Sequence, residues 1–198
     1  FRLSEHIDRL IKSAKTLNLT LPFSHKELMD ATVELVRKNE LKAGYIRPIA
    51  FFGYGSMGLI PKGAQITVAI ACWPWPAYHG DKPLKVKTSS FIRIHPKSLH
   101  ANAKVCGHYV NSIIAAQEAQ QHGCDEALLL DFEGHVAEGP GENLFLVKDS
   151  VIITPKVGAI LEGITRDSVI TLAKDAGFPV EERVVFPAEL KKQAWAPM

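Results

Sequence analysis

Apolar residues recur with helical spacing at the start of the chain. They occupy Leu3, Ile7, Leu10, Ile11, Ala14 and Leu17. Steps of three and four residues put such positions on one face, so an amphipathic helix is predicted between residues 1 and 17. Ser24 and Glu27 then have the spacing of a capping box, in which two side chains bond backbone N–H groups at a helix start. A second helix is predicted from about His25 to Lys38.

Two strands are expected next, Tyr45 to Phe52 and Gln65 to Cys72, with the glycine-rich sequence F-G-Y-G-S-M-G-L-I-P-K-G between them. The segment W-P-W-P-A-Y-H-G-D-K-P follows, and its prolines and glycine make it a rigid, irregular connection. A domain boundary is predicted there, with a small N-terminal lobe over residues 1–77, an interdomain loop over 78–85 and a larger lobe over 86–198.

Short strands and helices alternate through the rest of the chain. Strands are predicted at 86–94, 126–131, 135–137, 143–148, 151–154 and 180–185. Helices are predicted from about Lys104 to Gln121 and from Thr165 to Asp175, the latter with Gly177 as its stop, and a short helix follows Pro187. Short strands mixed with several helices predict an α+β fold in two lobes.

Composition narrows the possible function classes. The 198 residues are 46% hydrophobic and 22% charged, values typical of a globular protein. A formal net charge of +2 without a basic run gives no support for nucleic-acid binding, and no apolar run is long enough to span a bilayer. Cys72, Cys106 and Cys124 are odd in number and form no C-x-x-C pair. We therefore expect reduced thiols in a cytoplasmic protein, with neither a disulfide framework nor a metal site.

One lysine stands out chemically. Lys104 lies among small residues near a predicted helix start, with no acidic residue within ten positions on either side. A lysine in a partly apolar pocket can lose its proton and attack an aldehyde. Tyr109 follows five residues later and can hydrogen-bond a bound ring, and Glu138 lies between predicted strands, where it can pair with a protonated ring nitrogen. These are roles that pyridoxal phosphate requires of a protein, together with a phosphate cup.

Each of these residues also has an ordinary interpretation. A single lysine at a helix start is more often solvated, Tyr109 suits a half-buried helix aromatic, and Glu138 suits a turn. The triplet Gly163–Thr165 precedes a predicted helix, where backbone N–H groups suit a phosphate, but its threonine equally suits a simple helix cap. Arg9, in the first predicted helix, is by the same reasoning an ordinary surface arginine.

Three motifs give a further indication. The run A-K-V-C-G-H-Y-V-N-S, the loop V-A-E-G-P-G-E-N-L-F and the later L-E-G-I-T-R-D occur in this order. They closely resemble branched-chain amino acid aminotransferases, which are fold type IV pyridoxal-phosphate enzymes. The resemblance runs from Phe1 to about Leu190. It implies the two-lobed fold type IV architecture, with a small N-terminal α/β lobe and a larger, cofactor-binding C-terminal lobe.

The resemblance implies a site for pyridoxal 5′-phosphate. Lys104 matches the lysine that binds the cofactor's aldehyde and later moves the proton of the substrate's α-carbon. Glu138 matches the partner of the pyridine nitrogen, and Tyr109 the partner of the ring's phenolate oxygen. The residues that match the phosphate cup are Arg9, Gly163, Ile164 and Thr165. Glu142 and Asn143 are interpreted as supports of their loop.

A substrate pocket is implied as well. Strand alternation puts Tyr45 and Arg47 on one face, and a buried arginine there needs an anion, either an internal partner or a substrate carboxylate. By resemblance, the tyrosine meets the α-carboxylate and the arginine the side-chain carboxylate of glutamate. Trp75 and Tyr78 match aromatics of an apolar wall, with core packing as the alternative. Leu59 matches a loop residue that reaches the neighbouring subunit's pocket.

The activity implied is transamination of leucine, isoleucine or valine with 2-oxoglutarate, in a homodimer or larger homo-oligomer. D-amino acid aminotransferases and aminodeoxychorismate lyases share the fold, but the pair Tyr45 and Arg47 and the W-P-W-P-A-Y segment favour the branched-chain enzyme. The family has a segment before Phe1 and a later glycine-threonine-alanine-alanine loop that do not occur in this sequence. A second hypothesis, of a different class, is therefore a truncated, inactive fragment that binds the cofactor or dimerises.

Overall fold

The computed structural model describes residues 1–76, 82–190 and the strand at 195–197. The chain divides into two compact units, Phe1–Asp81 and Lys82–Met198, and this division lies within the predicted interdomain loop. No helix in these described ranges is long and apolar enough to cross a membrane. Each unit has its own helices, sheet and core.

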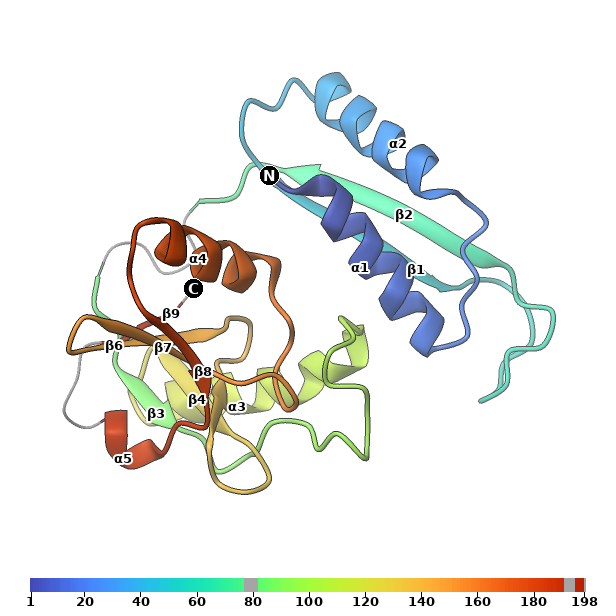
Figure 1. Cartoon of the computed structure of the whole chain (residues 1–198). Coiled ribbons are helices and arrows are strands. Elements are labelled where there is room, and N and C mark those ends of the chain that lie inside the picture. Colours follow the sequence, from blue (N-terminus) through green and yellow to red (C-terminus); the bar gives the residue numbers. More distant parts are fainter. Residues whose placement is uncertain (77–81, 191–194, 198) are drawn as a thin grey trace. The chain divides into compact units, whose positions relative to one another are not determined.

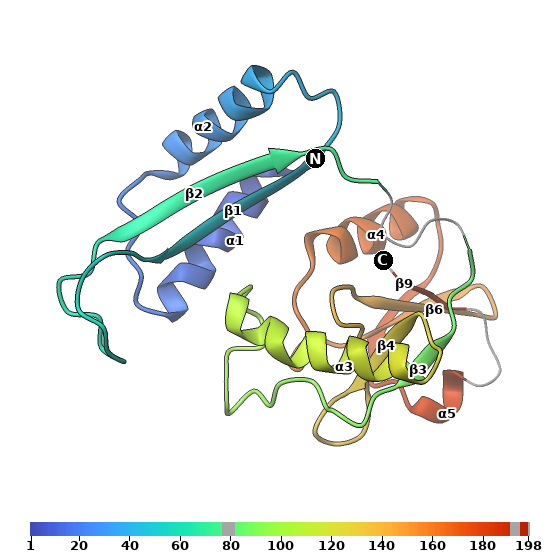
Figure 2. The same cartoon turned by 180° about the vertical axis from the view of Figure 1, so that it is seen from behind.

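The first unit is a two-stranded sheet with two helices on one face, as Figures 1 and 2 show from opposite sides. Its elements are α1 (Leu3–Thr16), α2 (His25–Lys38), β1 (Tyr45–Phe52) and β2 (Ile66–Trp73). The two strands are antiparallel, with Tyr45 opposite Trp73. Ser24 and Glu27 form the predicted capping box at the start of α2, which confirms that interpretation.

The core of this unit is small. Ile7 and Ala14 of α1, Leu28 of α2 and Leu19 between the helices are buried, as the apolar spacing of both helices predicts. Every residue of β1 and β2 keeps part of its surface exposed. The helices therefore supply most of the buried apolar surface of the first unit.

The second unit contains two sheets with helices packed against them (Figure 1). One sheet has the strand order β3-β4-β5 and the other the order β8-β7-β6-β9. The strands are β3 (Val86–Thr88), β4 (Glu126–Leu130), β5 (Val136–Glu138), β6 (Leu144–Lys148), β7 (Val151–Pro155), β8 (Val180–Arg183) and β9 (Trp195–Pro197). The helices are α3 (Tyr109–Gln121), preceded by a 3₁₀ turn (Cys106–His108), α4 (Ile164–Asp175) and α5 (Pro187–Leu190).

Two strand–helix–strand connections organise this unit. β3 and β4 are parallel and joined through α3, while β7 and β8 are parallel and joined through α4. Parallel neighbours need such a crossover because the chain must return to the same end of the sheet. α3 packs on β4, where Ala115 and Ala119 are buried against Ala127 and Leu129. The small side chains of Ala115, Ala119 and Ala127 let the helix pack directly on the strand.

The main core of the second unit joins its two sheets. Its buried residues are Leu128, Val136, Leu144, Leu146, Ile153 and Val185. They come from β4, β5, β6 and β7 and from the segment after β8. This packing fixes the end of β5, from which the chain enters the loop that carries the G-P-G-E-N motif.

Several elements differ from the prediction. The strand expected over 86–94 ends at Thr88, because the Ser89 hydroxyl and the next backbone N–H bond Glu118 of α3 instead of extending the ladder. The helix expected to start at Lys104 begins only with the 3₁₀ turn two residues later. The strand β9, which no pattern predicted, pairs antiparallel with β6.

Candidate active site

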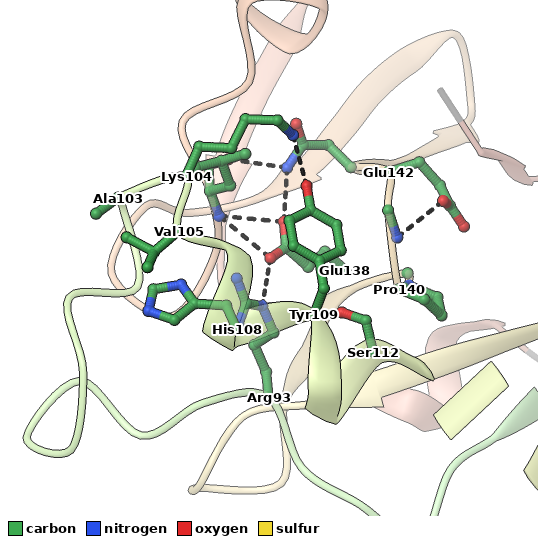
Figure 3. Close-up of a pocket in the computed structure, with 14 residues that line it drawn as sticks. Arg93, Ala103, Lys104, Val105, His108, Tyr109, Ser112, Glu138, Pro140 and Glu142 are labelled. Atoms are coloured by element: carbon green, nitrogen blue, oxygen red, sulfur yellow. Dashed lines mark hydrogen bonds and ion pairs between the residues drawn. The ribbon is translucent and has the colours of Figure 1, made fainter. Parts of the chain in front are cut away.

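A pocket opens in the second unit where four segments meet (Figure 3). It contains about 400 Å³ of space, part of it continuous with solvent. Its walls come from the chain before α3, the start of α3, the end of β5 with the loop to β6, and the segment before α4. Its polar or charged side chains are Arg93, Lys104, His108, Tyr109, Ser112, Glu138, Glu142 and Asn143.

Lys104 and Tyr109 meet at the rim of this pocket (Figure 3). The Lys104 amine donates a hydrogen bond of 2.6 Å to the Tyr109 hydroxyl and lies 5.3 Å from the centre of the tyrosine ring. Lys104 is exposed and lies in the irregular stretch before the 3₁₀ turn, next to the buried Ala103. The two predicted residues are thus brought together, but at an open rim rather than in the partly apolar surroundings that we expected.

Glu138 is a buried carboxylate at the end of a strand, not the turn or loop residue that the sequence suggested. It is the last residue of β5 and is 5% exposed. It accepts hydrogen bonds from Arg93 Nε at 2.5 Å, from Asn143 Nδ2 at 2.9 Å and from the Leu161 N–H at 3.1 and 3.2 Å to its two oxygens. Burial raises the pKa of Glu138, and the Arg93 guanidinium opposes that rise. Asn143, expected only to support its loop, therefore contacts the carboxylate directly.

Two buried basic residues of the pocket were not predicted as site residues. Arg93 is 8% exposed, and its partner is Glu138. Arg93 could have been identified from the sequence, because it is a single arginine inside the apolar run F-I-R-I and needs an anion once that run is buried. His108 is also buried, and its burial, helped by the charge of Arg93, lowers its pKa, so its ring is neutral at pH 7.

Glu142 belongs to the same loop and is held differently. Its carboxylate accepts a hydrogen bond from the Gly141 N–H at 3.1 Å. A Cβ at Gly139 would overlap Glu142 Oε1, so a larger residue at that position would force the Glu142 side chain to move. Burial raises the pKa of Glu142 to about 7, and the neighbouring carboxylates of Glu126 and Glu138 act in the same direction.

The predicted phosphate-binding triplet adjoins the pocket but does not line it. Gly163 is the N-cap of α4, which begins at Ile164, one residue earlier than predicted. A Cβ at Gly163 would overlap Asn143 Oδ1, so glycine is needed for the asparagine to fit. Thr165 is exposed in the first turn, while Leu161 on the same segment does line the pocket.

Four side chains of the first unit form an aromatic and cationic cluster. Tyr45, Trp73 and Trp75 have ring centres 5.2–5.6 Å apart. The Arg47 guanidinium lies 5.1 Å from the Tyr45 ring centre and 5.3 Å from that of Trp73. Tyr45 and Arg47 therefore share a face, as strand alternation predicts. Arg47 is exposed, however, so the premise that this arginine is buried and needs an anion is wrong.

Two other residues predicted for the phosphate and substrate sites, Arg9 and Leu59, belong to the first unit, whereas the described pocket is lined by residues of the second. Arg9 is in α1, where its Nη2 lies 3.3 Å from His6 Nδ1. Leu59 is fully exposed in the connection between β1 and β2. Tyr78 falls outside the residues that the structure describes. The roles of these three residues stay predictions.

Comparison with known sequences gives the family. The sequence model of the family described as Amino-transferase class IV matches residues 1–196. The chain belongs to the class IV aminotransferases. The three motifs that resemble fold type IV enzymes are thus part of a match that extends over nearly the whole chain.

This class IV aminotransferase is 49% identical over 187 residues to the branched-chain-amino-acid aminotransferase of Pseudomonas aeruginosa, a match that covers 92% of the chain and 61% of the relative. Its fold superposes on the crystal structure of the Escherichia coli branched-chain enzyme with a TM-score of 0.97 at 40% identity, covering 100% of the chain and 67% of that structure.

A third comparison is with the branched-chain amino acid aminotransferase of Thermobaculum terrenum in its holo-form, which contains pyridoxal phosphate. The TM-score is 0.91 at 37% identity, and the match covers 96% of the chain and 63% of that structure. These superpositions confirm the predicted α+β, fold type IV class. The chain spans about 61% of the length of the Pseudomonas aeruginosa relative.

Proposed function

We propose that this class IV aminotransferase transfers amino groups between leucine, isoleucine or valine and 2-oxoglutarate, with pyridoxal 5′-phosphate as its cofactor. The observation that carries the proposal is one pocket lined both by the hydrogen-bonded pair Lys104 and Tyr109 and by the buried carboxylate of Glu138. The name of the Pseudomonas aeruginosa relative supports the reaction and its branched-chain substrates. The holo-form structure of the Thermobaculum terrenum relative supports the cofactor.

The pocket residues fit the functional groups of pyridoxal phosphate. An aldehyde requires a primary amine, and Lys104 offers one at the open rim. A phenolate oxygen requires a hydroxyl donor, and Tyr109 provides one. A protonated ring nitrogen requires a carboxylate, and Glu138 provides one in the pocket lining. When bound, the cofactor supplies the aldehyde and an electron-accepting ring through which an amino group is transferred.

Lys104 has two tasks in this proposal. Its Nζ holds the cofactor, and after an amino acid has displaced it, the same nitrogen takes the proton from the substrate's α-carbon. The Tyr109 hydroxyl, 2.6 Å from Nζ, restricts where the amine can lie. Exposure of Lys104 at the rim leaves its amine accessible to an amino acid that enters from solvent.

Glu138 supplies the charge that keeps the ring nitrogen protonated. An anion next to this nitrogen favours its positively charged form, because opposite charges at close range stabilise each other strongly away from water. The carboxylate is fixed by three donors and excluded from solvent, so it would meet the ring without first rearranging.

The phosphate is assigned to the N-terminus of α4, with Gly163, Ile164 and Thr165, and to Arg9. Backbone N–H groups in the first turn of a helix and the positive end of its dipole favour an anion, and a guanidinium forms paired bonds with phosphate oxygens. The triplet and the pocket share a wall through Asn143, which contacts both Gly163 and Glu138.

Substrate contacts are assigned to the first unit. Tyr45 and Arg47 present a hydroxyl and a cation on one face, which suit the carboxylates of an amino acid and of 2-oxoglutarate. Trp75, Tyr78 and Leu59 are assigned to the apolar wall that accepts a branched side chain. We further propose a cytoplasmic homodimer or larger homo-oligomer in which Leu59 serves the partner's pocket. The described cysteines are free thiols, which suits a reducing compartment.

The cofactor is tested by adding pyridoxal phosphate to the purified chain, recording its visible spectrum, reducing with borohydride and mapping the labelled peptide. We expect a new absorption band and a stable adduct on Lys104. Lys104→Ala should lose both, whereas Lys97→Ala, which removes an exposed lysine of the same segment, should lose neither. A label spread over surface lysines, or a band that survives Lys104→Ala, would refute the cofactor assignment.

The substrate class is tested on the loaded chain in single-turnover mode. L-leucine, L-isoleucine and L-valine should each change the spectrum and release their 2-oxo acid, and 2-oxoglutarate should reverse the change. D-alanine is the control, because it is a substrate for the D-amino acid aminotransferases of the same fold. A response to D-alanine but not to L-leucine would replace the branched-chain assignment with the D-amino acid one.

A further inference from the structure

We propose that Arg93 is a positioning residue of the site, which clamps the Glu138 carboxylate in one orientation and balances its charge, so that the carboxylate can meet the cofactor's ring N–H. The inference rests on the proposed function, because it concerns the carboxylate that would meet the pyridoxal phosphate ring. Arg93 itself would not touch the reacting atoms.

The hydrogen bonds of Glu138 fix the orientation of its carboxylate. A carboxylate has about four lone-pair positions for acceptance. In the structure, Oε1 accepts from Arg93 Nε, Oε2 accepts from Asn143 Nδ2, and the Leu161 N–H is shared between the two oxygens. The three donors thus make four contacts, two on each oxygen, and the separate contacts from Arg93 and Asn143 set how the carboxylate is turned. Glu138 also lines the pocket in which the cofactor's ring N–H would approach it (Figure 3).

The Arg93 side chain starts from a fixed backbone. The Arg93 N–H donates to the Leu130 carbonyl at the end of β4, across 2.6 Å. The preceding carbonyl, of Ile92, accepts from Asn111 Nδ2 of α3 at 3.0 Å. The irregular stretch that replaces the expected strand is thus tied both to the sheet and to the helix. Only the torsions of the side chain itself are then left to be ordered when the guanidinium is held at the carboxylate.

Arg93 also places a positive charge beside Glu138. Arg93 and Glu138 are both almost fully buried, with side chains 9% and 6% exposed. A buried carboxylate without a cation takes up a proton, and it then no longer favours a positive charge on its neighbour. Lys104, Tyr109 and His108 also face this pocket, but burial keeps the His108 ring neutral and Lys104 is exposed. Arg93 is therefore the buried cation that balances Glu138 among the described pocket residues.

The test is made on the full chain loaded with ¹⁵N-labelled pyridoxal phosphate, in which the ring nitrogen reports its own protonation by NMR. Wild type should hold the ring proton through neutral pH. Arg93→Gln keeps a donor of similar length but removes the charge, and we expect its ring nitrogen to lose the proton at a pH at least about one unit lower, with at least roughly tenfold weaker cofactor binding. Arg93→Lys keeps the charge but not the planar donor, so the shift should be smaller and in the same direction.

Arg166→Gln is the matched control. Arg166 is 5% exposed and pairs with Glu182 at 2.8 Å, outside the pocket lining. Its loss should destabilise the chain without moving the ring-nitrogen titration. If either folded Arg93 variant titrates like wild type, the positioning role is wrong, and should Arg93→Gln fail to fold, Arg93→Lys decides alone. Failure of the proposed function looks different, since wild type itself would then show no adduct on Lys104 or an unprotonated ring.

Discussion

The second unit contains a buried ion pair, whereas the ion pairs described in the first unit lie on helix surfaces. In the first unit, pairs such as Lys26 and Asp30 lie along a helix surface, with side chains 84% and 65% exposed. In the second unit, the pair Arg93 and Glu138 is 9% and 6% exposed. Exposed pairs contribute little because water and salt screen them. A buried pair is sensitive to the loss of either partner, since the other charge is then left without compensation.

The hydrophobic cores of the two units also differ in how completely they bury apolar side chains. Phe51 and Phe52 of β1 are partly exposed, and Tyr54, Met57 and Leu59 in the loop after it are almost fully exposed. The second unit instead has a continuous core that joins two sheets and ends at the strand that carries Glu138. Packing and site geometry are therefore coupled in the second unit, so a substitution that weakens its core should also disturb the pocket.

The largest effect is expected from the core of the second unit. Leu146 is fully buried in β6, and Leu146→Ala should lower the free energy of unfolding by about 2–5 kcal/mol. Chemical denaturation followed by circular dichroism measures this loss. Leu172→Ala is the control, since Leu172 of α4 is 67% exposed and should change stability by less than about 0.5 kcal/mol. A loss below about 1 kcal/mol for Leu146→Ala would contradict the core described above.

The next largest effect is expected at Gly163, whose close contact with Asn143 joins the segment before α4 to the pocket. In Gly163→Ala, the added methyl would overlap Asn143 Oδ1, and the asparagine would have to move. We expect a loss of about 1–3 kcal/mol in unfolding free energy and weaker binding of pyridoxal phosphate, because Asn143 holds Glu138. Gly107→Ala is the control, since a Cβ there would meet no described atom within 4 Å. Equal cofactor affinity in both variants would mean that the Asn143 contact does not orient the carboxylate.

Local patterns in the sequence predicted most elements because the interactions that define them are local. The capping box of Ser24 and Glu27 joins residues three apart, and the strand predicted from Tyr45 to Phe52 has those same bounds in the structure. The stop predicted for α4 is also met, with Gly177 at a positive φ of 81°. A glycine takes that conformation without the steric cost that a side chain would add.

Contacts between distant residues account for what was missed. Arg93 and Glu138 are 45 residues apart, and only folding reveals that each buries the other's charge. Leu161 donates its backbone N–H to Glu138, and a backbone contact of this kind cannot be predicted from the type of the residue. Lys104 and Tyr109 were identified, but through motif resemblance as much as chemistry. The spacing of residues alone did not predict that Glu138 would be buried at the end of a strand.

A smaller effect on stability is expected from Glu142, in the loop between β5 and β6. Burial raises the pKa of Glu142 from its usual 4.5 to about 7. Between these values the folded chain binds more protons than the unfolded chain, so this group's contribution to stability falls as pH rises from about 4.5 to about 7. Glu142→Gln cannot titrate and should gain stability over wild type, on the order of 1 kcal/mol, across that window. Denaturation midpoints at pH 5 and pH 8 measure the gain, and a constant difference between the two variants would refute the raised pKa.

The smallest effect compares ion pairs in the two units. Glu118 accepts hydrogen bonds from the Ser89 hydroxyl, from Lys87 and from the Ser90 N–H, which together lower its pKa to about 2. This stabilisation is present above about pH 4.5 and is lost as pH falls toward about 2, because the folded chain then has to take up a proton on a hydrogen-bonded carboxylate.

The matched variants are Glu118→Gln and Glu34→Gln, since Glu34 pairs with Lys38 on the exposed surface of α2 in the first unit. At pH 7, Glu118→Gln should lower the melting temperature more than Glu34→Gln, because the Glu118 carboxylate has several fixed donors and the Glu34 carboxylate has one flexible lysine. The difference in melting temperature between the two variants should narrow as pH falls below 4.5, because the larger contribution of Glu118 to stability is lost over that range. Equal losses at pH 7 would mean that the second unit draws no more stability from its partly buried pairs than the first draws from its surface, and the contrast between the units would then rest on Arg93 and Glu138 alone.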